Sequence, residues 1–248
     1  MVTKEGGEPN QQPTKEVIID GEVKAAVEAE RLYYTQFLKA QEMVLSDRPT
    51  KPVDAAIFFG RSWFDAEKSG VYQLLVDFYR SGKAKYIVIY GSRGQRFGDT
   101  KPNAVAPSHG FARARLVKME VADDSIINAP LIDSTKNNTL EQGKAFLRTA
   151  GEYNFKNLVV IDNPHQLLRE MLGLIATIDK QEEFHPQIWT AAPTSTDWQK
   201  RVMGAQGEHL GPRSDHIDLE NGRIRKYQDS GDLASFQRFF DYVNTRGR

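Results

Sequence analysis

The sequence contains no cysteine in its 248 residues. Disulfide frameworks, cysteine-ligated zinc, iron–sulfur clusters and thiol nucleophiles are therefore excluded, and any chemistry must use oxygen and nitrogen groups. The sequence also lacks a surplus of charge, because 33 lysines and arginines balance 33 aspartates and glutamates. Proteins that bind nucleic acid or anionic membranes usually carry a basic surplus, so we expect neither partner.

Long apolar runs are lacking as well. Runs such as Ala55–Gly60 and Tyr86–Tyr90 are far shorter than the roughly 20 residues that a membrane-crossing helix needs. The segment Met1–Pro13 is polar and has no apolar stretch of the kind found in a secretory signal. We therefore expect a soluble, cytoplasmic protein, with a disordered tail over residues 1–20 and a single domain over residues 21–248.

Apolar residues nevertheless make up 40% of the chain, which is enough for a packed core. An amphipathic helix is predicted over residues 22–44, and after Pro52 short apolar strands alternate with longer helices. The predicted strands are 55–59, 85–90, 125–132, 158–161 and 187–190, and the predicted helices are 71–80, 108–120, 139–153, 164–178 and 233–243. This alternation predicts a three-layer, Rossmann-like α/β fold, a parallel sheet with helices on both faces, with its core over residues 53–190.

The segment Ala192–Gln228 breaks the alternation, since it is rich in glycine, proline, histidine and charge. Long stretches without periodicity inside a compact domain are functional lids or misread elements, and both interpretations stay open here. The fold prediction therefore ends in an irregular C-terminal extension over residues 191–248.

Polar residues follow the predicted strands at the edge where ligands bind in open parallel sheets. Glycines there let a backbone approach a ligand closely, and the N–H groups of the following helices favour an anion. The loop at Gly91–Gly98 fits neither the dinucleotide nor the P-loop pattern, so a plain turn and a ligand loop both remain possible. The candidate ligand-binding residues at these junctions are Gly60, Arg61, Ser62, Gly91, Ser92, Arg93, Gly94, Asn138 and Thr139.

Two predicted helix starts carry candidate acid–base groups. Asn138 with Glu141 makes a capping-box pattern, which is a structural role, although Glu141 could also face the cleft. Asn163–Pro164 predicts an N-cap and first helical residue, which places His165 in the first turn, where the helix dipole keeps an imidazole neutral. Arg169 lies four residues on and could hold an anion beside it. No metal site is predicted, because the histidines lack ligand spacing.

A family resemblance rests on five segments in the same order as in the family. These segments are Asp54–Gly60, Lys85–Gln95, Asn138–Gln142, His165 with Arg169, and Glu220–Tyr227 with Gly231–Asp232. Together they resemble the YdcF/SanA-like domain-of-unknown-function family. The resemblance implies a Rossmann-like fold with a polar cleft, which Glu220 and Arg223 would close from the C-terminal segment. One member is associated with S-adenosylmethionine, so the resemblance implies that molecule as a candidate cofactor.

These observations lead to one main hypothesis and two alternatives. The main hypothesis is that a small anionic or nucleotide-like ligand, with S-adenosylmethionine as a candidate, binds at the carboxyl edge of the sheet. The first alternative is a hydrolase or transferase that acts on a phosphorylated or sugar-nucleotide substrate through His165 and Glu141. The second is a non-enzymatic regulatory protein with a vestigial pocket. The substrate, the reaction, the pathway and the oligomeric state do not follow from the sequence.

Overall fold

The computed structural model describes residues 15–60, 69–91, 95–96, 105–106, 108–132, 139–181, 184–194, 196–203 and 210–246. The chain divides into two compact units, with the boundary after Lys39. The first helix, α1 (Lys15–Ser46), runs through this boundary. Residues 15–20 thus belong to a helix rather than to the predicted tail. The last proline before them is Pro13, and the single glycine at position 21 weakens a helix by about 1 kcal/mol without ending it.

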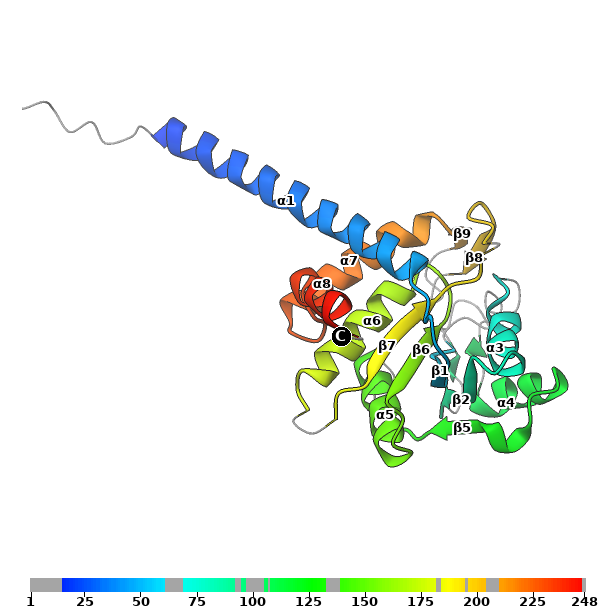
Figure 1. Ribbon diagram of the computed structural model, residues 1–248. Helices are drawn as coiled ribbons and strands as arrows, with labels where there is room; N and C mark the ends of the chain where they lie inside the picture. Colours follow the sequence, from blue (N-terminus) through cyan, green and yellow to red (C-terminus); the bar gives the residue numbers. More distant parts are fainter. Residues whose placement is uncertain are drawn as a thin grey trace, which may run out of the picture. The chain divides into compact units, whose positions relative to one another are not determined.

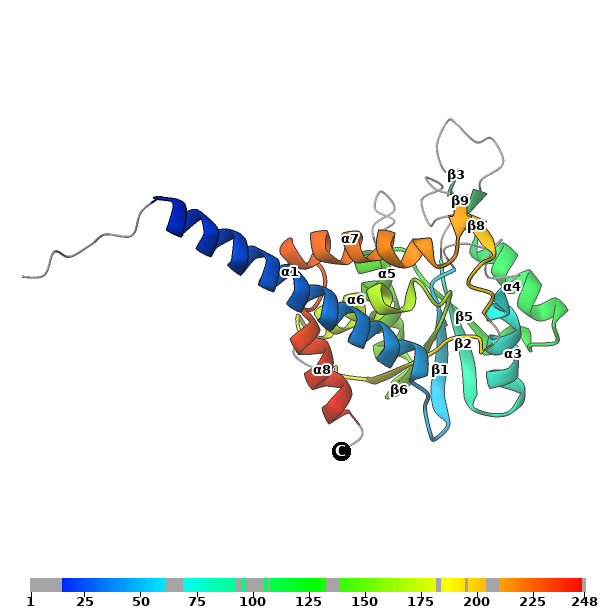
Figure 2. The same ribbon diagram turned by 90° about the horizontal axis from the view of Figure 1, so that it is seen from above.

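The second unit is built on a five-stranded, fully parallel sheet with the strand order β5–β2–β1–β6–β7 (Figures 1 and 2). Its strands are rich in the β-branched and aromatic residues that favour a pleated, buried surface. They are β1 (Val53–Phe58), β2 (Ala84–Tyr90), β5 (Ile126–Ala129), β6 (Asn157–Ile161) and β7 (Gln187–Ala191). A short pair, β3 (Gln95–Arg96) with β4 (Val105–Ala106), lies outside this sheet.

Helices cover both faces of the sheet, so the predicted three-layer α/β fold is confirmed (Figure 2). One face carries α3 and α4, and the other carries α5 and α6, with α8 packed beside α6. The bounds are α3 (Val71–Arg80), α4 (His109–Lys118), a 3-10 turn at Asp123–Ser125, α5 (Thr139–Glu152), α6 (Leu167–Ile178) and α8 (Phe236–Thr245).

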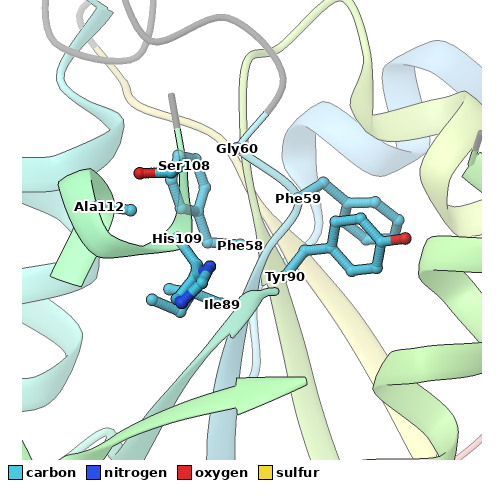
Figure 3. A pocket seen from close by; sticks show the side chains of 8 residues that line it. All are labelled: Phe58, Phe59, Gly60, Ile89, Tyr90, Ser108, His109 and Ala112. Carbon is cyan, nitrogen blue, oxygen red and sulfur yellow. The ribbon is translucent and has the colours of Figure 1, made fainter. Parts of the chain in front are cut away.

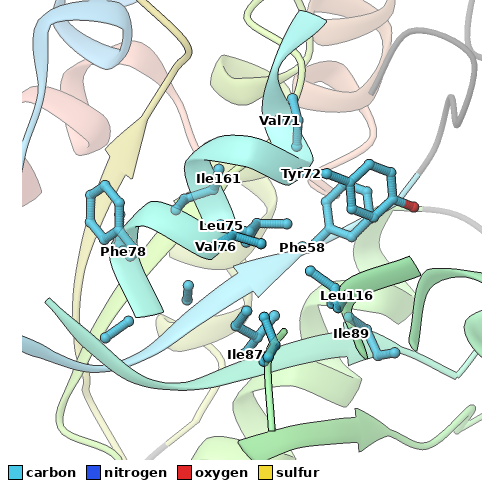
Figure 4. Close-up of a cluster of buried hydrophobic side chains, with 14 of the residues drawn as sticks. Phe58, Val71, Tyr72, Leu75, Val76, Phe78, Ile87, Ile89, Leu116 and Ile161 are labelled. Atoms are coloured by element: carbon cyan, nitrogen blue, oxygen red, sulfur yellow. The ribbon is translucent and has the colours of Figure 1, made fainter. Parts of the chain in front are cut away.

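The apolar core on the α3 side follows from the alternation of side chains along each strand. Ala56 and Phe58 of β1 point to this face, where they meet Leu75 of α3 and Leu116 of α4 (Figure 4). Ala55 and Ile57, which alternate with them, are buried but do not belong to this cluster. Burying a leucine or phenylalanine side chain contributes about 1.5–3 kcal/mol, so this cluster is a large part of what holds the α3 layer in place.

The segment that the sequence leaves irregular contains regular structure. It holds the antiparallel pair β8 (Arg201–Met203) and β9 (Leu210–Pro212), followed by α7 (Asp215–Asp229). The buried residues of α7 are His216, Glu220 and Ile224, which recur every fourth residue. Two of these three residues are polar, so a search for apolar residues at helical spacing does not detect this helix.

Candidate functional site

The carboxyl ends of β1 and β6 form the switch point of the sheet. From β1 the chain adds β2 and β5 on one side, and it then returns to place β6 and β7 on the other. Ligands of open α/β sheets bind at such a point. Here Asp162, which directly follows β6, is fully buried, and its Oδ2 accepts a hydrogen bond from the Gly60 N–H at 3.1 Å. Ser69 Oγ donates to Asn163 Oδ1 at 3.0 Å across the same point.

Two of the three candidate glycines, Gly60 and Gly91, lie among the described residues, and contacts within the fold explain both. Gly60 has a φ of 69°, a left-handed conformation that residues with a Cβ atom rarely adopt. Its N–H already donates to Asp162. Gly91 donates its N–H to Ala129 O at 2.8 Å, and a Cβ at position 91 would lie 2.8 Å from that same oxygen. The close backbone approach predicted at Gly91 is therefore made by the neighbouring strand end.

The start of α6 differs from the prediction. The helix begins at Leu167 with Gln166 as its N-cap, so Pro164 and His165 lie in the preceding turn rather than in the first helical turn. The reason is that Asn163 Oδ1 accepts a hydrogen bond from Ser69, while the Asn163 carbonyl accepts one from the Gln166 N–H at 2.9 Å. The turn is fixed from outside by Gln41 Nε2, which donates to Pro164 O at 3.1 Å.

Arg169 is the centre of a buried ion-pair network that joins three helices. Its guanidinium donates to both carboxylate oxygens of Glu220 on α7 and to Thr139 Oγ1 at the start of α5. Glu220 accepts a further hydrogen bond from Arg223 Nη1. The side chains of Arg169 and Glu220 are 3% and 2% exposed, so this pairing occurs away from water. Four of the residues predicted for the site, Thr139, Arg169, Glu220 and Arg223, are thus in direct contact.

His165 lies beside this network among positive groups. Its ring centroid is 5.4 Å from that of His216, which is buried and hydrogen-bonded through Nε2 to Val202 O at 3.0 Å. Burial lowers the pKa of His165 well below 6.5, and its neighbours His216, Arg213, Arg169 and Arg223 lower it further. The ring is therefore neutral at pH 7, as predicted, but through burial and neighbouring charges and without a position inside the helix. We refer to Thr139, His165, Arg169, Arg213, His216, Glu220 and Arg223 as the His165 cluster.

The charge of Arg169 is secured by its partner. Although burial alone would lower its pKa, attraction and hydrogen bonding to Glu220 raise the pKa of Arg169 above its usual value. The pKa of Arg223 is lowered, first by burial and then by the charge of Arg169. One carboxylate, that of Glu220, therefore stands between two guanidinium groups that repel each other.

A small cavity lies at the ends of β1 and β2, beside Gly60 and the start of α4 (Figure 3). Its volume is about 20 Å³, which is room for roughly one water molecule. His109 and Ser108 lie at its wall at the start of α4, where Ser108 Oγ caps the helix by accepting from the Phe111 N–H. Its remaining lining is Phe58, Phe59, Gly60, Ile89, Tyr90 and Ala112.

Glu141, the other candidate acid–base group, is buried in the first turn of α5 and forms an ion pair with Lys144 Nζ at 2.8 Å. Its carboxylate is therefore engaged by a cation of its own helix. The candidates Arg61, Ser62, Ser92, Arg93, Gly94 and Asn138 lie outside the described residues.

Sequence reasoning missed three polar residues of this edge as site residues, Asp162, Arg213 and His216. Asp162 directly follows a strand, so the rule that located His165 could have found it. Arg213 is fully buried, and its guanidinium donates to Asp197 O. Both residues lie in the segment that the sequence leaves irregular, so no periodicity in the sequence predicts this contact. His216 is found only if one expects polar residues on the buried face of α7.

Comparisons of the chain with known proteins find no relative. No protein-family model, no curated protein and no solved structure matches the chain. Among the residues that the structure describes, no cluster of three or more histidine, aspartate or glutamate residues is arranged to hold a metal ion. Within the same described ranges, no helix has both the length and the apolar character needed to cross a membrane.

Proposed function

We propose that the protein binds a small anionic, nucleotide-like ligand at the carboxyl edge of its sheet, beside the His165 cluster. The observation that carries this proposal is the gathering of three arginines, Arg169, Arg213 and Arg223, around a buried histidine at the switch point of an open α/β sheet. Glu220 neutralises part of this charge. The buried Glu170 also acts on Arg169, whereas the arginines lower the pKa of His165, and a phosphate or carboxylate placed beside them would be attracted.

The composition of the edge supports a ligand with both an anionic and a flat apolar part. Phe58, at the end of β1, lies at the cavity next to Gly60, whereas the ring of Tyr90 points away from it toward Phe146 of α5 (Figure 3). Arg169 and Arg223 belong to α6 and α7. Nucleotides, sugar nucleotides and S-adenosylmethionine each combine a planar base with a phosphate or carboxylate, and S-adenosylmethionine is the one implied by the resemblance to the YdcF/SanA-like family.

The binding test is thermal unfolding of the full chain with inorganic phosphate, AMP, a sugar nucleotide and S-adenosylmethionine, each in turn. A ligand present at 100 times its Kd adds about 2.7 kcal/mol to the free energy of unfolding. In a domain of this size that raises Tm by roughly 5–10 °C. We expect at least one nucleotide-like compound to produce such a shift, and a smaller shift with phosphate alone.

A matched pair of variants tests whether the ligand binds beside the His165 cluster. Arg223→Gln removes a partly buried guanidinium of the cluster, whereas Arg238→Gln removes an exposed one that pairs with Asp179. The first variant should reduce the ligand-induced shift in Tm and the second should leave it unchanged. An equal shift in both variants, or no shift with any compound at millimolar concentration, contradicts the proposal.

A second candidate function is hydrolysis or group transfer on a phosphorylated or sugar-nucleotide substrate. The neutral state of His165 favours it, because an unprotonated imidazole can accept a proton from an attacking hydroxyl. The test is turnover of sugar nucleotides and phosphate monoesters by His165→Asn. Loss of turnover with the Tm shift retained supports catalysis, while ligand binding without turnover in the unmodified chain points to the regulatory alternative.

A further inference from the structure

The carboxylate of Glu220 occupies a position that is built like an anion-binding site. Arg169 donates to both of its oxygens, and the longer of these two contacts, from Nη2 to Oε1, measures 3.4 Å. Arg223 Nη1 also donates to Oε1. The guanidinium of Arg169 is oriented by Thr139 Oγ1, which accepts from its Nη1. Guanidinium groups that converge on one oxyanion are the arrangement by which proteins usually bind phosphate and carboxylate groups.

The attachment of α7 does not by itself require this ion pair. The cost of removing a carboxylate and a guanidinium from water offsets much of their attraction, so apolar residues of similar volume hold a buried helix face at least as well. Helix α3 is attached in that way, through residues such as Leu75 and Val76. A role that depends on charge accounts for the pair more fully, and the exchange of one anion for another is such a role.

Glu220 leaves part of the surrounding positive charge uncompensated. Glu170 offsets part of the charge of Arg169, whereas the pKa of Arg223 is lowered by burial and by the charge of Arg169. A phosphate group carries about two negative charges on three terminal oxygens, whereas a carboxylate carries one charge on two. A phosphate can therefore neutralise the two guanidinium groups more completely than Glu220 does.

Arg223 gives an anion access to this position. Its side chain is 17% exposed, against 2% for Glu220 and 3% for Arg169. Glu220 and Arg223 are three residues apart and so lie on one face of α7. An anion from solvent can thus pair with Arg223 before it reaches Arg169.

Other contacts hold α7 at both ends. Near its start, His216 is hydrogen-bonded through Nε2 to Val202 O of β8 at 3.0 Å. Beyond its end, the Ala234 N–H donates to Leu172 O of α6 at 3.1 Å. Glu220 lies between these two points, so a change in its pairing loosens the middle of the helix without detaching the segment.

We propose that the Glu220 carboxylate is an internal substitute for the anionic group of the ligand. The phosphate or carboxylate of an incoming ligand takes the position of Glu220 on Arg169, Glu220 turns toward solvent, and Arg223 then attaches α7 to the ligand. This inference rests on the proposed function, because it describes how the same site is kept closed. Helix α7 is then a gate whose Glu220 competes with the ligand.

Glu220→Gln tests the substitution, because it removes the internal anion and leaves an amide of similar size. The Tm of the full chain with this change should rise by roughly 5–10 °C in about 20 mM inorganic phosphate, relative to sodium chloride of equal ionic strength. The unmodified chain should gain less than half as much, since its Glu220 already fills the position. If the variant does not fold in chloride, phosphate should restore its folding, which circular dichroism measures.

Glu152→Gln is the matched control. It removes the same charge from an exposed pair with Arg148, so it reports the general effects of phosphate and of net charge. Its Tm should respond to phosphate as that of the unmodified chain does. Equal gains in all three chains overturn the proposal, and so does a Glu220→Gln chain that phosphate does not stabilise.

Arg223 locates the bound anion. Adding Arg223→Gln to Glu220→Gln should raise the phosphate concentration needed for half of the gain in Tm by at least roughly tenfold. Adding Arg238→Gln, which breaks the exposed pair with Asp179, should leave that concentration unchanged. An equal effect of the two additions contradicts an anion held by Arg223.

Failure of the substitution and failure of the proposed function give different results. If AMP or a sugar nucleotide stabilises the unmodified chain but phosphate does not stabilise Glu220→Gln more strongly, ligand binding stands and the role of Glu220 is overturned. If phosphate stabilises Glu220→Gln while no nucleotide-like compound stabilises the unmodified chain, the substitution is supported and the proposed function fails.

Discussion

Helices α3 and α7 both belong to the second unit, but different forces hold them in it. The buried side chains of α3 are apolar apart from the hydroxyl of Tyr72, and Leu75 and Val76 among them are fully enclosed (Figure 4). The buried side chains of α7 are His216, Glu220 and Ile224, so a single apolar residue is accompanied by an ion pair and a histidine. The attachment of α3 depends on area removed from water, whereas that of α7 depends on which groups are charged.

This difference predicts that the attachment of α3 is insensitive to pH and to anions, whereas the attachment of α7 is sensitive to both. Apolar burial hardly depends on pH, whereas burial of the neutral His165 becomes more costly as the pH falls below 6.5, and the buried charges of α7 respond to a nearby anion. The attachment of α7, the helix that would close the candidate site, is therefore expected to depend on bound ligand and on pH. Four changes can break or sharpen this contrast.

The largest effect is expected for Glu220→Gln. It removes the carboxylate between Arg169 and Arg223 and leaves two buried guanidinium groups without their partner. Breaking a buried ion pair in this way costs about 3–5 kcal/mol. Urea unfolding should show this loss, while Glu152→Gln, which breaks the exposed pair with Arg148, should change the free energy of unfolding by less than about 0.5 kcal/mol. Similar small losses in both variants would mean that α7 is not held by charge.

Leu75→Ala on α3 should have the next largest effect. The side chain is completely buried in the apolar cluster, and leucine-to-alanine changes in such places cost about 2–5 kcal/mol. Because no charge is involved, the loss should be the same at pH 5.5 and pH 7.5 in urea unfolding. A loss that varies with pH would contradict the contrast between the two helices.

A pH-dependent loss of stability is expected from His165. Its pKa is lowered in the folded protein, so below pH 6.5 the unfolded chain binds a proton that the folded chain does not. Stability from this residue is therefore complete above pH 6.5 and falls by about 1.4 kcal/mol per pH unit below it, until the folded pKa is reached. His165→Gln should remove that part of the slope when free energies of unfolding at pH 7 and pH 5.5 are compared. An unchanged slope would show that the imidazole is not buried in its neutral form.

Ile224→Val should have the smallest effect. Ile224 is the single fully buried apolar residue among the three on α7, and loss of one methylene group costs about 0.5–1.5 kcal/mol. Urea unfolding should therefore place this variant well above Glu220→Gln in stability. If the two rank in the opposite order, apolar packing rather than charge holds α7.

The same contrast decides how much could be predicted from the sequence. The strands and α3 follow from apolar runs and apolar period, because residues such as Leu75 and Ile87 are buried for being apolar. The buried face of α7 could not be found in this way, since Glu220 is buried only because Arg169, 51 positions away in sequence, accompanies it. A pairing at that separation is visible only after folding.

Within the candidate site, the rule that ligands bind where strands end depends on topology alone, and it directs attention to His165 and Arg169, which follow the end of β6. The exact start of α6 could not be predicted. Asn163 is a favourable N-cap by residue type, but its side-chain oxygen accepts a hydrogen bond from Ser69. This contact overrides the local capping preference, and α6 begins at Leu167.

Gly91 has a consequence for the history of this protein. A methyl group at position 91 would lie 2.8 Å from the Ala129 carbonyl oxygen, and that oxygen belongs to the backbone and so cannot be replaced by mutation. Descendants of the same ancestor could exchange Arg169, Glu220 and His165 as their ligands diverged, yet the glycine would have to persist for as long as the ends of β2 and β5 kept this spacing. Among descendants that keep this spacing, a glycine is therefore expected at the end of the second strand even where the residues of the site differ.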